Sequence, residues 1–334
     1  MVRIVRIDTP DGDQRDLFDQ WAQMYIIAGQ HLFGDDHSAW SADQLRELHR
    51  SRERLRIAWV AVDHEQVVGS VQLVMPMRDN PQLTLVNLAV APEHRRQGLG
   101  SALLELAEQE GLRHGRSVFM ADTQWGASQR DESGEGFAAA KGYAAAQTLA
   151  RNTLSLPADT TLLEQWCAGD GGDGYVLRTC WDGIPQEWLA DRAELSRRMS
   201  TDAPLGDLEL EEERWDEQRV REEYERIAAM GRRFVETFAV DERTGRLVGH
   251  TQVQVSTEAP RVAYQQDTLV LREHRGHRLG LRLKAANTLA VMEQSPGTQV
   301  VRTWNAEENR HMLAVNEQLG YVRDGFLREW QKVV

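Results

Sequence analysis

The chain has little cysteine and no long hydrophobic run, and each shortage excludes a class of protein. Its 334 residues include two cysteines, Cys167 and Cys180, too few for a disulfide framework or a cysteine-based metal cluster. We therefore predict two reduced thiols and no metal site. No run of about 18 apolar residues occurs, so a membrane span is not expected. Residues 1–6 become polar too quickly for a signal peptide.

The charge balance is acidic, with 39 Lys and Arg against 52 Asp and Glu and a formal net charge of −13 at pH 7. An acidic chain is disfavoured as a general nucleic-acid binder because it repels the phosphate backbone. Hydrophobic residues make up 41% of the chain and charged residues 27%, as in ordinary globular proteins. The composition favours a cytoplasmic protein that binds neither nucleic acid nor membrane.

One basic, glycine-spaced segment distinguishes residues 88–104. An apolar strand pattern ends at Pro92, the loop Arg95–Gly100 follows, and a helix pattern with Leu103 and Leu104 begins at once. A strand, a tight turn and a helix N-terminus bring free backbone N–H groups together, and glycine lets a phosphate approach them closely. The loop lacks the Lys-Ser/Thr ending of a P-loop, and its glycines have the wrong spacing for the dinucleotide fingerprint. It predicts an anion site of another kind.

The pattern Val90-Ala-Pro92 followed by Arg95-x-x-Gly98-x-Gly100 closely resembles the pyrophosphate loop of the GCN5-related N-acetyltransferase (GNAT) superfamily. The resemblance implies that this loop holds the pyrophosphate of acetyl-CoA, the cosubstrate of that family. The alternative is an ordinary strand-to-helix turn with a solvated basic face.

The same signature occurs a second time, 180 positions later. The repeated residues Glu93, His94, Arg95, Leu99, Gly100 and Leu103 return as Glu273, His274, Arg275, Leu279, Gly280 and Leu283. So long a period indicates two copies of one domain rather than a solenoid. We predict an N-terminal domain at 1–157, a linker at 158–174 and a C-terminal domain at 175–334. This layout resembles the tandem two-domain actinobacterial members of the superfamily, mycothiol synthase included, although no residue identifies mycothiol chemistry.

Hydrophobic periodicity predicts the same order of elements in both copies. Strands are expected at 3–7, 56–62, 67–75, 83–90, 117–122, 147–156, 175–179, 233–241, 246–255, 264–271 and 299–303, with a last strand after Gly320-Tyr321. Helices are expected at 13–31, 45–54, 97–111, 131–141, 186–199, 219–230, 277–293 and 307–319. Each copy is therefore predicted as an α+β, sandwich-like domain, with a mixed, mostly antiparallel twisted sheet flanked by helices.

The resemblance also implies which residues contact acetyl-CoA. In the family, the strand before the loop pairs with the pantetheine arm, which here means Leu88 and Val90 in the first copy and Thr268 and Val270 in the second. The loop residues expected to contact the cofactor are Arg95, Arg96, Gln97, Gly98, Leu99, Gly100 and Ser101, and in the second copy Arg275, Gly276, His277, Arg278 and Gly280. Arg278 replaces the glycine of position 98, and its side chain either crowds the pyrophosphate or grips it.

Residues for proton transfer are scarce. In the family a tyrosine often protonates the leaving thiolate, but Ala138 and Asn316 stand at that position in the two copies. The family's cofactor-side asparagine is replaced by Asp131 in the first copy and kept in the second. We expect the second copy to supply the catalytic residues, which are Asp267, Asn305 and Asn309. The alternatives are a solvated strand-edge acid at position 267 and a water chain in place of a base.

The resemblance implies an enzyme that transfers an acetyl group from acetyl-CoA to a primary amine of a small molecule, by direct attack on the thioester. The acidic charge is compatible with a cationic amine. Asp35 and Asp36, between the first two helices, either hold that amine or belong to a polar loop. Two alternatives stay open: a protein or peptide N-acetyltransferase, and one active domain beside a degenerate scaffold or ligand-sensing domain. A homodimer is compatible with each.

Overall fold

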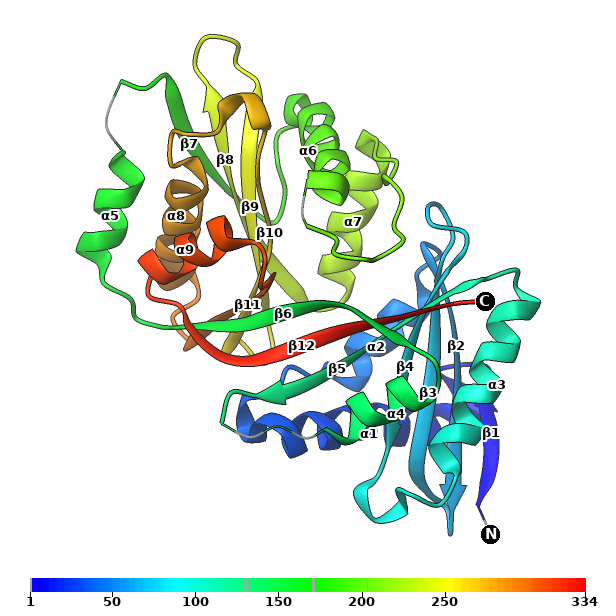
Figure 1. Cartoon of the computed structure of the whole chain (residues 1–334). Coiled ribbons are helices and arrows are strands. Elements are labelled where there is room, and N and C mark those ends of the chain that lie inside the picture. Colours follow the sequence, from blue (N-terminus) through cyan, green and yellow to red (C-terminus); the bar gives the residue numbers. More distant parts are fainter. Residues whose placement is uncertain (1, 129, 131, 170–171, 203) are drawn as a thin grey trace. The chain divides into compact units, whose positions relative to one another are not determined.

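The computed structural model describes residues 2–128, 130, 132–169, 172–202 and 204–334, which form two compact units (Figure 1). The first unit contains Met1–Thr148, Gly206–Leu210 and Phe326–Val334. The second contains Leu149–Leu205 and Glu211–Gly325. The first unit therefore includes two pieces of chain from the second sequence repeat.

The first unit is a sheet with helices on both faces. Its elements are β1 (Arg3–Ile7), η1 (Gly12–Gln14), α1 (Arg15–Phe33), η2 (Gly34–Asp36), α2 (Ala42–Arg50), β2 (Arg54–Asp63), β3 (Gln66–Pro76), β4 (Leu83–Val90), η3 (Pro92–His94), α3 (Leu99–Arg113), β5 (Val118–Gly126), α4 (Ser133–Ala140) and the first part of β6 (Ala144–Ser155). The strand order is β1-β2-β3-β4-β5, and the end of β12 (Val322–Val333) lies next to β5. Neighbours from β1 to β4 are antiparallel, whereas β4 and β5 are parallel.

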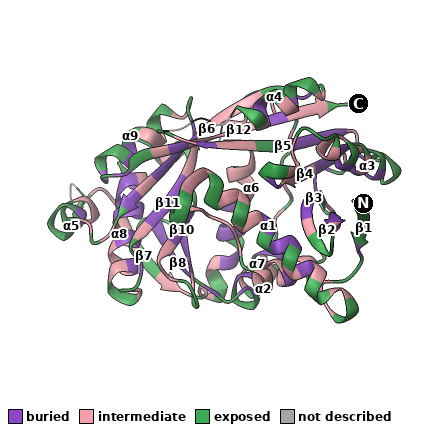
Figure 2. Ribbon diagram, turned by 90° about the horizontal axis from the view of Figure 1, so that it is seen from below, coloured by how far each residue is buried: buried purple, intermediate pink, exposed green. Residues whose placement is uncertain are grey.

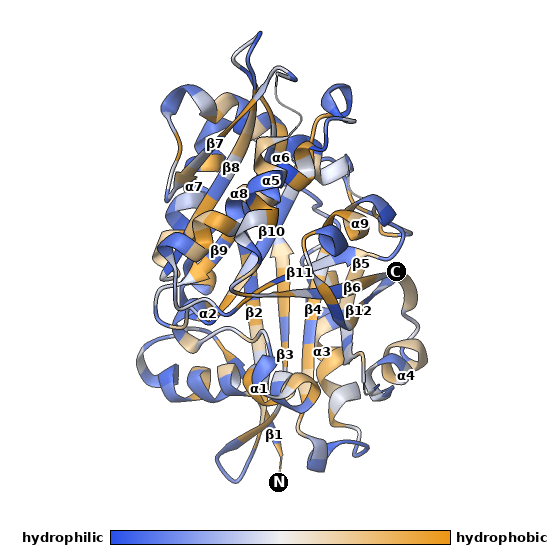
Figure 3. Ribbon diagram, turned by 90° about the vertical axis from the view of Figure 1, so that its left-hand side faces the viewer, coloured by the Kyte–Doolittle hydropathy of each residue, from blue (hydrophilic) through white to orange (hydrophobic). Residues whose placement is uncertain are grey.

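Alternation along β2 decides which helix covers which face of this sheet. Ala58, Val60 and Val62 pack against buried residues of α1, including Trp21. The residues between them belong to a separate cluster that contains Leu103 of α3. Helix α1 therefore covers one face and α3 the other, and hydrophobic residues concentrate in the strands between them (Figure 3).

The second unit repeats this architecture. Its elements are the second part of β6, α5 (Thr160–Ala168), β7 (Tyr175–Trp181), η4 (Gln186–Trp188), α6 (Leu189–Asp202), α7 (Glu217–Ala229), β8 (Arg232–Asp241), β9 (Leu247–Ser256), β10 (Val262–Val270), η5 (Arg272–His274), α8 (Leu279–Gln294), β11 (Val300–Ala306), α9 (Arg310–Gln318) and the start of β12. The strand order is β6-β11-β10-β9-β8-β7, antiparallel except for β10 and β11. The predicted α+β fold with a mixed, mostly antiparallel sheet is confirmed in both units.

Helix α5 was not predicted from the sequence, and it packs on α8. Leu163 of α5 is buried in the cluster that contains Leu281 and Ala285 of α8. As a result α8 is buried on most sides, whereas α3 buries a single face (Figure 2). Within the described residues, none of these helices has the length and apolarity needed to span a bilayer. Cys167 and Cys180 are free thiols.

The parallel strands of each unit separate after a short ladder. Among the described residues, β4 pairs with β5 over Leu83–Leu85 alone, and β10 pairs with β11 over Val262–Tyr264 alone. Strand β10 also has a bulge, because its register with β9 shifts between Gln265 and Thr268, whereas β4 pairs evenly with β3. In each unit the strands therefore open just before the loop that the sequence singles out.

Candidate functional site

The loop Arg95–Gly100 forms an open cradle at the N-terminus of α3. Arg96 and Gly98 have left-handed backbone, with φ of 62° and 84°. Arg95 Nε donates to Val90 O over 3.1 Å, which ties the loop to the end of β4. A Cβ added at Gly98 would meet no atom within 4 Å. The first N–H groups of α3 have no acceptor within the helix, so the cradle has room, donors and basic residues for a phosphate group.

The loop Arg275–Gly280 has a similar backbone, but arginine and glycine have changed places. Here Gly276 has φ of 92° and Arg278 has φ of 53°. Arg275 Nε donates to Val270 O over 3.0 Å, as Arg95 does to Val90 in the first unit. The open position is Gly276, where an added Cβ would meet no atom within 4 Å. The left-handed backbone at Arg278 costs about 1 kcal/mol relative to glycine.

A carboxylate from inside the second unit forms ion pairs with two arginines at the second loop, one in the loop and one just before it. Asp202, at the end of α6, is 2.9 Å from Arg272 and accepts a 2.8 Å hydrogen bond from Arg275. Its side chain is only 4% exposed, so the charge is held inside the unit. In the first copy Pro92 stands where the second has Arg272. The second loop therefore carries its own anion beside the N-terminus of α8.

The two helices also differ one turn beyond the loops. Leu104 of α3 packs with Ala138 and Tyr143 in the first hydrophobic core. The repeat-equivalent residue of α8 is Lys284, which is 1% exposed and has its Nζ 4.8 Å from the centre of the Tyr321 ring. Burial lowers the pKa of Lys284 to about 7. An apolar contact of the first unit is thus a buried amine in the second.

The structure places two of the predicted catalytic residues in structural contacts. Asn309 is the N-cap of α9, where its side chain accepts a hydrogen bond from Met312 N over 3.2 Å. Asn305 of β11 accepts a 2.7 Å hydrogen bond from Asn316 Nδ2. Asn316 is 1% exposed, and its Oδ1 has no partner among the described residues. The tyrosine position of the second copy therefore holds a buried amide, and Asp131 lies outside the described residues.

The third predicted catalytic residue, Asp267, is exposed at the bulge of β10, beside a buried charged network. At the centre of that network, Glu236 of β8 accepts bonds of 2.5 Å from Arg192 and 2.7 Å from Tyr224 and lies 2.9 Å from His250 Nδ1. Burial opposes ionisation of Glu236, but these partners prevail and lower its pKa to about 2. Burial and Arg192 lower the pKa of His250, while the charges of Glu236 and Asp267 act against them.

The other residues predicted to contact the cofactor lie in the two loops, in the strands that lead into them or in the helical turns that follow. Leu88 and Val90 pair with β3 and contact the first core, and Val270 pairs with Gly249 of β9. His277 lies against Tyr175, with ring centres 5.0 Å apart. The remaining predicted cofactor contacts lie in the two loops or the first turns that follow them, namely Gln97, Leu99, Gly100, Ser101 and Gly280.

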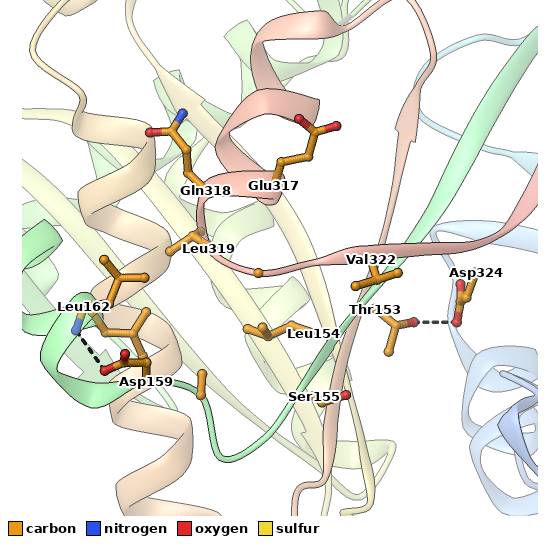
Figure 4. A pocket seen from close by; sticks show the side chains of 13 residues that line it. Thr153, Leu154, Ser155, Asp159, Leu162, Glu317, Gln318, Leu319, Val322 and Asp324 are labelled. Atoms are coloured by element: carbon orange, nitrogen blue, oxygen red, sulfur yellow. Dashed lines mark hydrogen bonds between the residues drawn. The ribbon is translucent and has the colours of Figure 1, made fainter.

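A groove of about 450 Å³ lies on the second unit away from its loop (Figure 4). It runs between α5, α9 and the neighbouring parts of β6 and β12. Two of its acidic side chains are already engaged: Asp159 caps α5, and Asp324 accepts a 2.7 Å hydrogen bond from Thr153. No residue of the loop 275–280 lines this groove, so it is separate from the predicted cofactor site.

Sequence reasoning missed a pair of acids in the first unit, Asp122 of β5 and Glu329 of β12. The available signal was an acid directly after the apolar residues 118–121 of a strand. Their pairing was not visible, because 207 positions separate them in the sequence.

Comparison with known proteins gives one family and several structural relatives. The model of the Acetyltransferase (GNAT) family matches residues 18–126 and 203–321. A tandem GNAT protein from the clavulanic acid biosynthesis pathway is 27% identical, with a TM-score of 0.81, and the match covers 100% of this chain and 98% of that one. A GCN5-related N-acetyltransferase from Sphaerobacter thermophilus is 17% identical, with a TM-score of 0.66 and coverage of 99% and 95%. Curated proteins gave no significant match.

Proposed function

The chain belongs to the acetyltransferase (GNAT) family, with two GNAT domains in tandem, and we propose that it is an acetyl-CoA-dependent N-acetyltransferase whose first unit performs the transfer. The acceptor in this proposal is the primary amine of a small molecule. Acetyl-CoA supplies the activated acetyl group as a thioester. The chain's own residues bind the phosphates, hold the arm and receive protons.

The observation that carries the proposal is the open cradle of the first loop. Gly98 has left-handed backbone and empty space where a side chain would lie, at the N-terminus of α3. Arg95, Arg96 and the first N–H groups of that helix would hold the pyrophosphate. Leu88 and Val90 would present backbone groups to the pantetheine arm, because β4 and β5 have separated by that point. A backbone N–H of β4 is our candidate donor to the oxyanion.

For the second unit we propose a supporting role rather than a second transfer site. Asp202 already forms ion pairs with both Arg272 and Arg275, so an incoming pyrophosphate would have to displace a buried carboxylate. Asn309 and Asn305 are engaged in a helix cap and an amide pair. Catalytic roles for Asp267, Asn305 and Asn309 stay predictions, as do cofactor contacts at Val270, Arg275, Gly276, His277, Arg278 and Gly280.

Calorimetric titration with acetyl-CoA tests this assignment. We expect one site per chain. Gly98→Asp places a negative charge beside the pyrophosphate, and we expect it to weaken binding more than about tenfold, or roughly 1.4 kcal/mol. The substitution should fold, since no atom lies within 4 Å of the new Cβ and Asp tolerates left-handed backbone.

Gly276→Asp is the matched control, because it introduces the same charge at the open position of the second loop. We expect its affinity and stoichiometry to equal those of the wild type. A loss of binding in Gly276→Asp alone would move the cofactor site to the second unit, and two sites in the wild type would show that both units bind acetyl-CoA; either result would refute the proposal.

A further inference from the structure

Two carboxyl groups lie on the same face of the first unit's sheet. The role that we assign to them below depends on the acetyl transfer proposed above for this unit. Asp122 lies on β5 and Glu329 on β12. The residues that follow them are joined on the opposite face, where Trp330 Nε1 donates to Thr123 Oγ1 over 2.9 Å. Because successive side chains of a strand alternate, Asp122 and Glu329 both point to the face that α1 covers.

This pair has no cationic partner among the described residues. Asp122 accepts one hydrogen bond, from Gln124 Nε2 over 2.9 Å. Glu329 Oε2 is buried and accepts no hydrogen bond from any residue that the structure describes. Two carboxylates close together without a counter-charge are unfavourable, and such pairs are typical of sites that receive a cation.

The two cations of β12 nearest to Glu329 face away from the pair, and Arg323 of the same strand lies 3.3 Å from Glu307. Arg328 is 2.5 Å from Glu135, and Lys332 is 2.8 Å from Glu108. Both lie on the face of Trp330, since they are separated from it by two positions along the strand. Asp122 is therefore the charged group that acts most strongly on Glu329. Burial first, and Asp122 second, raise the pKa of Glu329 to about 7.

Tyr25 of α1 and the segment 206–210 complete the surroundings. The Tyr25 hydroxyl is buried, and its pKa is raised by burial and by the charge of Asp122 against the opposing effect of the neighbouring Trp21 indole. Gln331, on the same face as Glu329, accepts a 2.9 Å hydrogen bond from Glu209 N. That segment adds the acids Asp207 and Glu209. Asp122 keeps solvent exposure, so a small molecule has access to the pair, while the protein packed around its carboxyl group raises its pKa.

We propose that Asp122, Glu329 and Tyr25 form the acceptor site of the first unit, and that this site takes a small cationic primary amine. Asp122 binds the ammonium group, Glu329 removes one of its protons, and the Tyr25 hydroxyl hydrogen-bonds to the amine. The Tyr25 ring lines the apolar side of the substrate, and it is held in place by the buried Trp21 ring behind it, with ring centres 5.2 Å apart.

The transfer step then balances. Glu329 accepts one proton from the ammonium, which leaves a neutral amine with a lone pair. That lone pair forms the new C–N bond at the thioester carbonyl, and the C–S bond breaks with its electrons on sulfur. The second amine proton passes to the thiolate, and Glu329 releases the first proton to solvent. The products are an amide and free coenzyme A.

The second unit has a different pair in the equivalent place. Asp122 is the fifth residue of β5, and Trp304 is the fifth residue of β11. Trp304 pairs with Arg151 of β6, which is 1% exposed and lies 3.5 Å from Asp324. The second unit therefore presents an indole and a paired cation where the first presents two carboxylates, and it offers no equivalent site for an ammonium group.

Kinetics with isosteric variants test the acceptor site. Wild type with acetyl-CoA is screened against diaminoalkanes, amino sugars and a lysine peptide, following thiol release. We expect a small cationic amine to be accepted and kcat/KM to fall below about pH 7, where Glu329 becomes protonated. Asp122→Asn should raise the KM for the amine more than about tenfold, and Glu329→Gln should lower kcat by a similar factor and remove that acid limb.

Thermal unfolding gives a readout that needs no turnover. A raised carboxyl pKa means that wild type loses stability as pH rises from about 4.5 to about 7. Glu329→Gln should therefore melt above wild type at about pH 8 and level with it near pH 4.5. Adding 1,4-diaminobutane at about pH 8 should raise the melting temperature of wild type more than that of Glu329→Gln, with sodium chloride at equal ionic strength as reference. Glu65→Gln, in the β2–β3 turn, is the matched charge control and should behave as wild type.

The outcomes separate the two proposals. If wild type binds no acetyl-CoA, the proposed function fails, while the melting experiment still reports on the pair. If acetyl-CoA binds but both isosteric variants keep the wild-type KM, kcat and pH profile, the acceptor site is wrong. Acetylation of the lysine peptide with no small amine accepted also overturns it.

Discussion

The two units share one fold but fill equivalent interior positions with opposite chemistry. Ala58 of β2 and Glu236 of β8 occupy the same place, since they pair with Gln72 and Gln252 of the next strands. In the first unit this position is an apolar contact under α1, and in the second it is the centre of a charged network under α6. In the first unit, Asp122 and Glu329 have no cationic partner among the described residues, whereas Glu236 of the second unit is paired with Arg192. The difference indicates that the first unit has carboxylates available to a ligand, whereas the second uses this carboxylate for its own stability.

The largest effect should come from removing the central charge of the second unit. Glu236→Gln leaves Arg192 buried without its carboxylate, and we expect a destabilisation of roughly 3–5 kcal/mol in urea unfolding. Because the folded pKa of Glu236 is depressed, its contribution is complete above about pH 4.5 and is lost as pH falls toward 2. Glu223→Gln, which loses a partly exposed pair with Arg226, is the control and should cost less than about 1 kcal/mol. Equal costs for the two variants would show that the network is not a stability element.

Replacing the buried lysine of the second unit should have the opposite effect on stability to replacing Glu236. The chain has three lysines, and Lys284 is the one that α8 buries. Lys284→Met should stabilise the second unit by roughly 3 kcal/mol at neutral pH, since a depressed lysine pKa penalises folding fully below about pH 7. The gain should shrink as pH rises toward about 10.5. The reverse exchange, Leu104→Lys, should destabilise the first unit, and thermal unfolding of both variants across this pH range measures the effect. A destabilised Lys284→Met would mean that the ammonium has a structural role.

The smallest effect concerns the loops. Asp202→Asn removes the internal anion from Arg272 and Arg275, and we expect the second loop to gain about tenfold in acetyl-CoA affinity, seen as a weak second site in calorimetry. Asp182→Asn, which removes an exposed ion pair with Arg233 in the same unit, is the control. If Asp202→Asn still shows one site, Arg278 rather than Asp202 separates the two loops.

Local signals in the sequence predicted the fold and the loops but not the contacts between distant segments. Periodicity located the strands and the helices other than α5, and the glycine spacing located both cradles, because these features depend on neighbouring residues. The exchange of arginine and glycine between positions 96, 98, 276 and 278 was visible only in part, since φ angles are not written in the sequence. Asp122 and Glu329 meet through strand order, and Asp202 reaches Arg275 across 73 positions, so neither pair could be predicted from spacing.

The last strand has a consequence for how the protein is made. Phe326–Val334 belong to the first unit, where Trp330 is buried in the core and Val334 N donates to Ser117 O over 2.9 Å. Domains usually fold in order as the ribosome releases them. Here the first unit is complete only after residues 326–334, which include Glu329, have been synthesised. A fragment that ends between the two repeats would lack this strand, so we expect the first repeat not to fold as a separate domain.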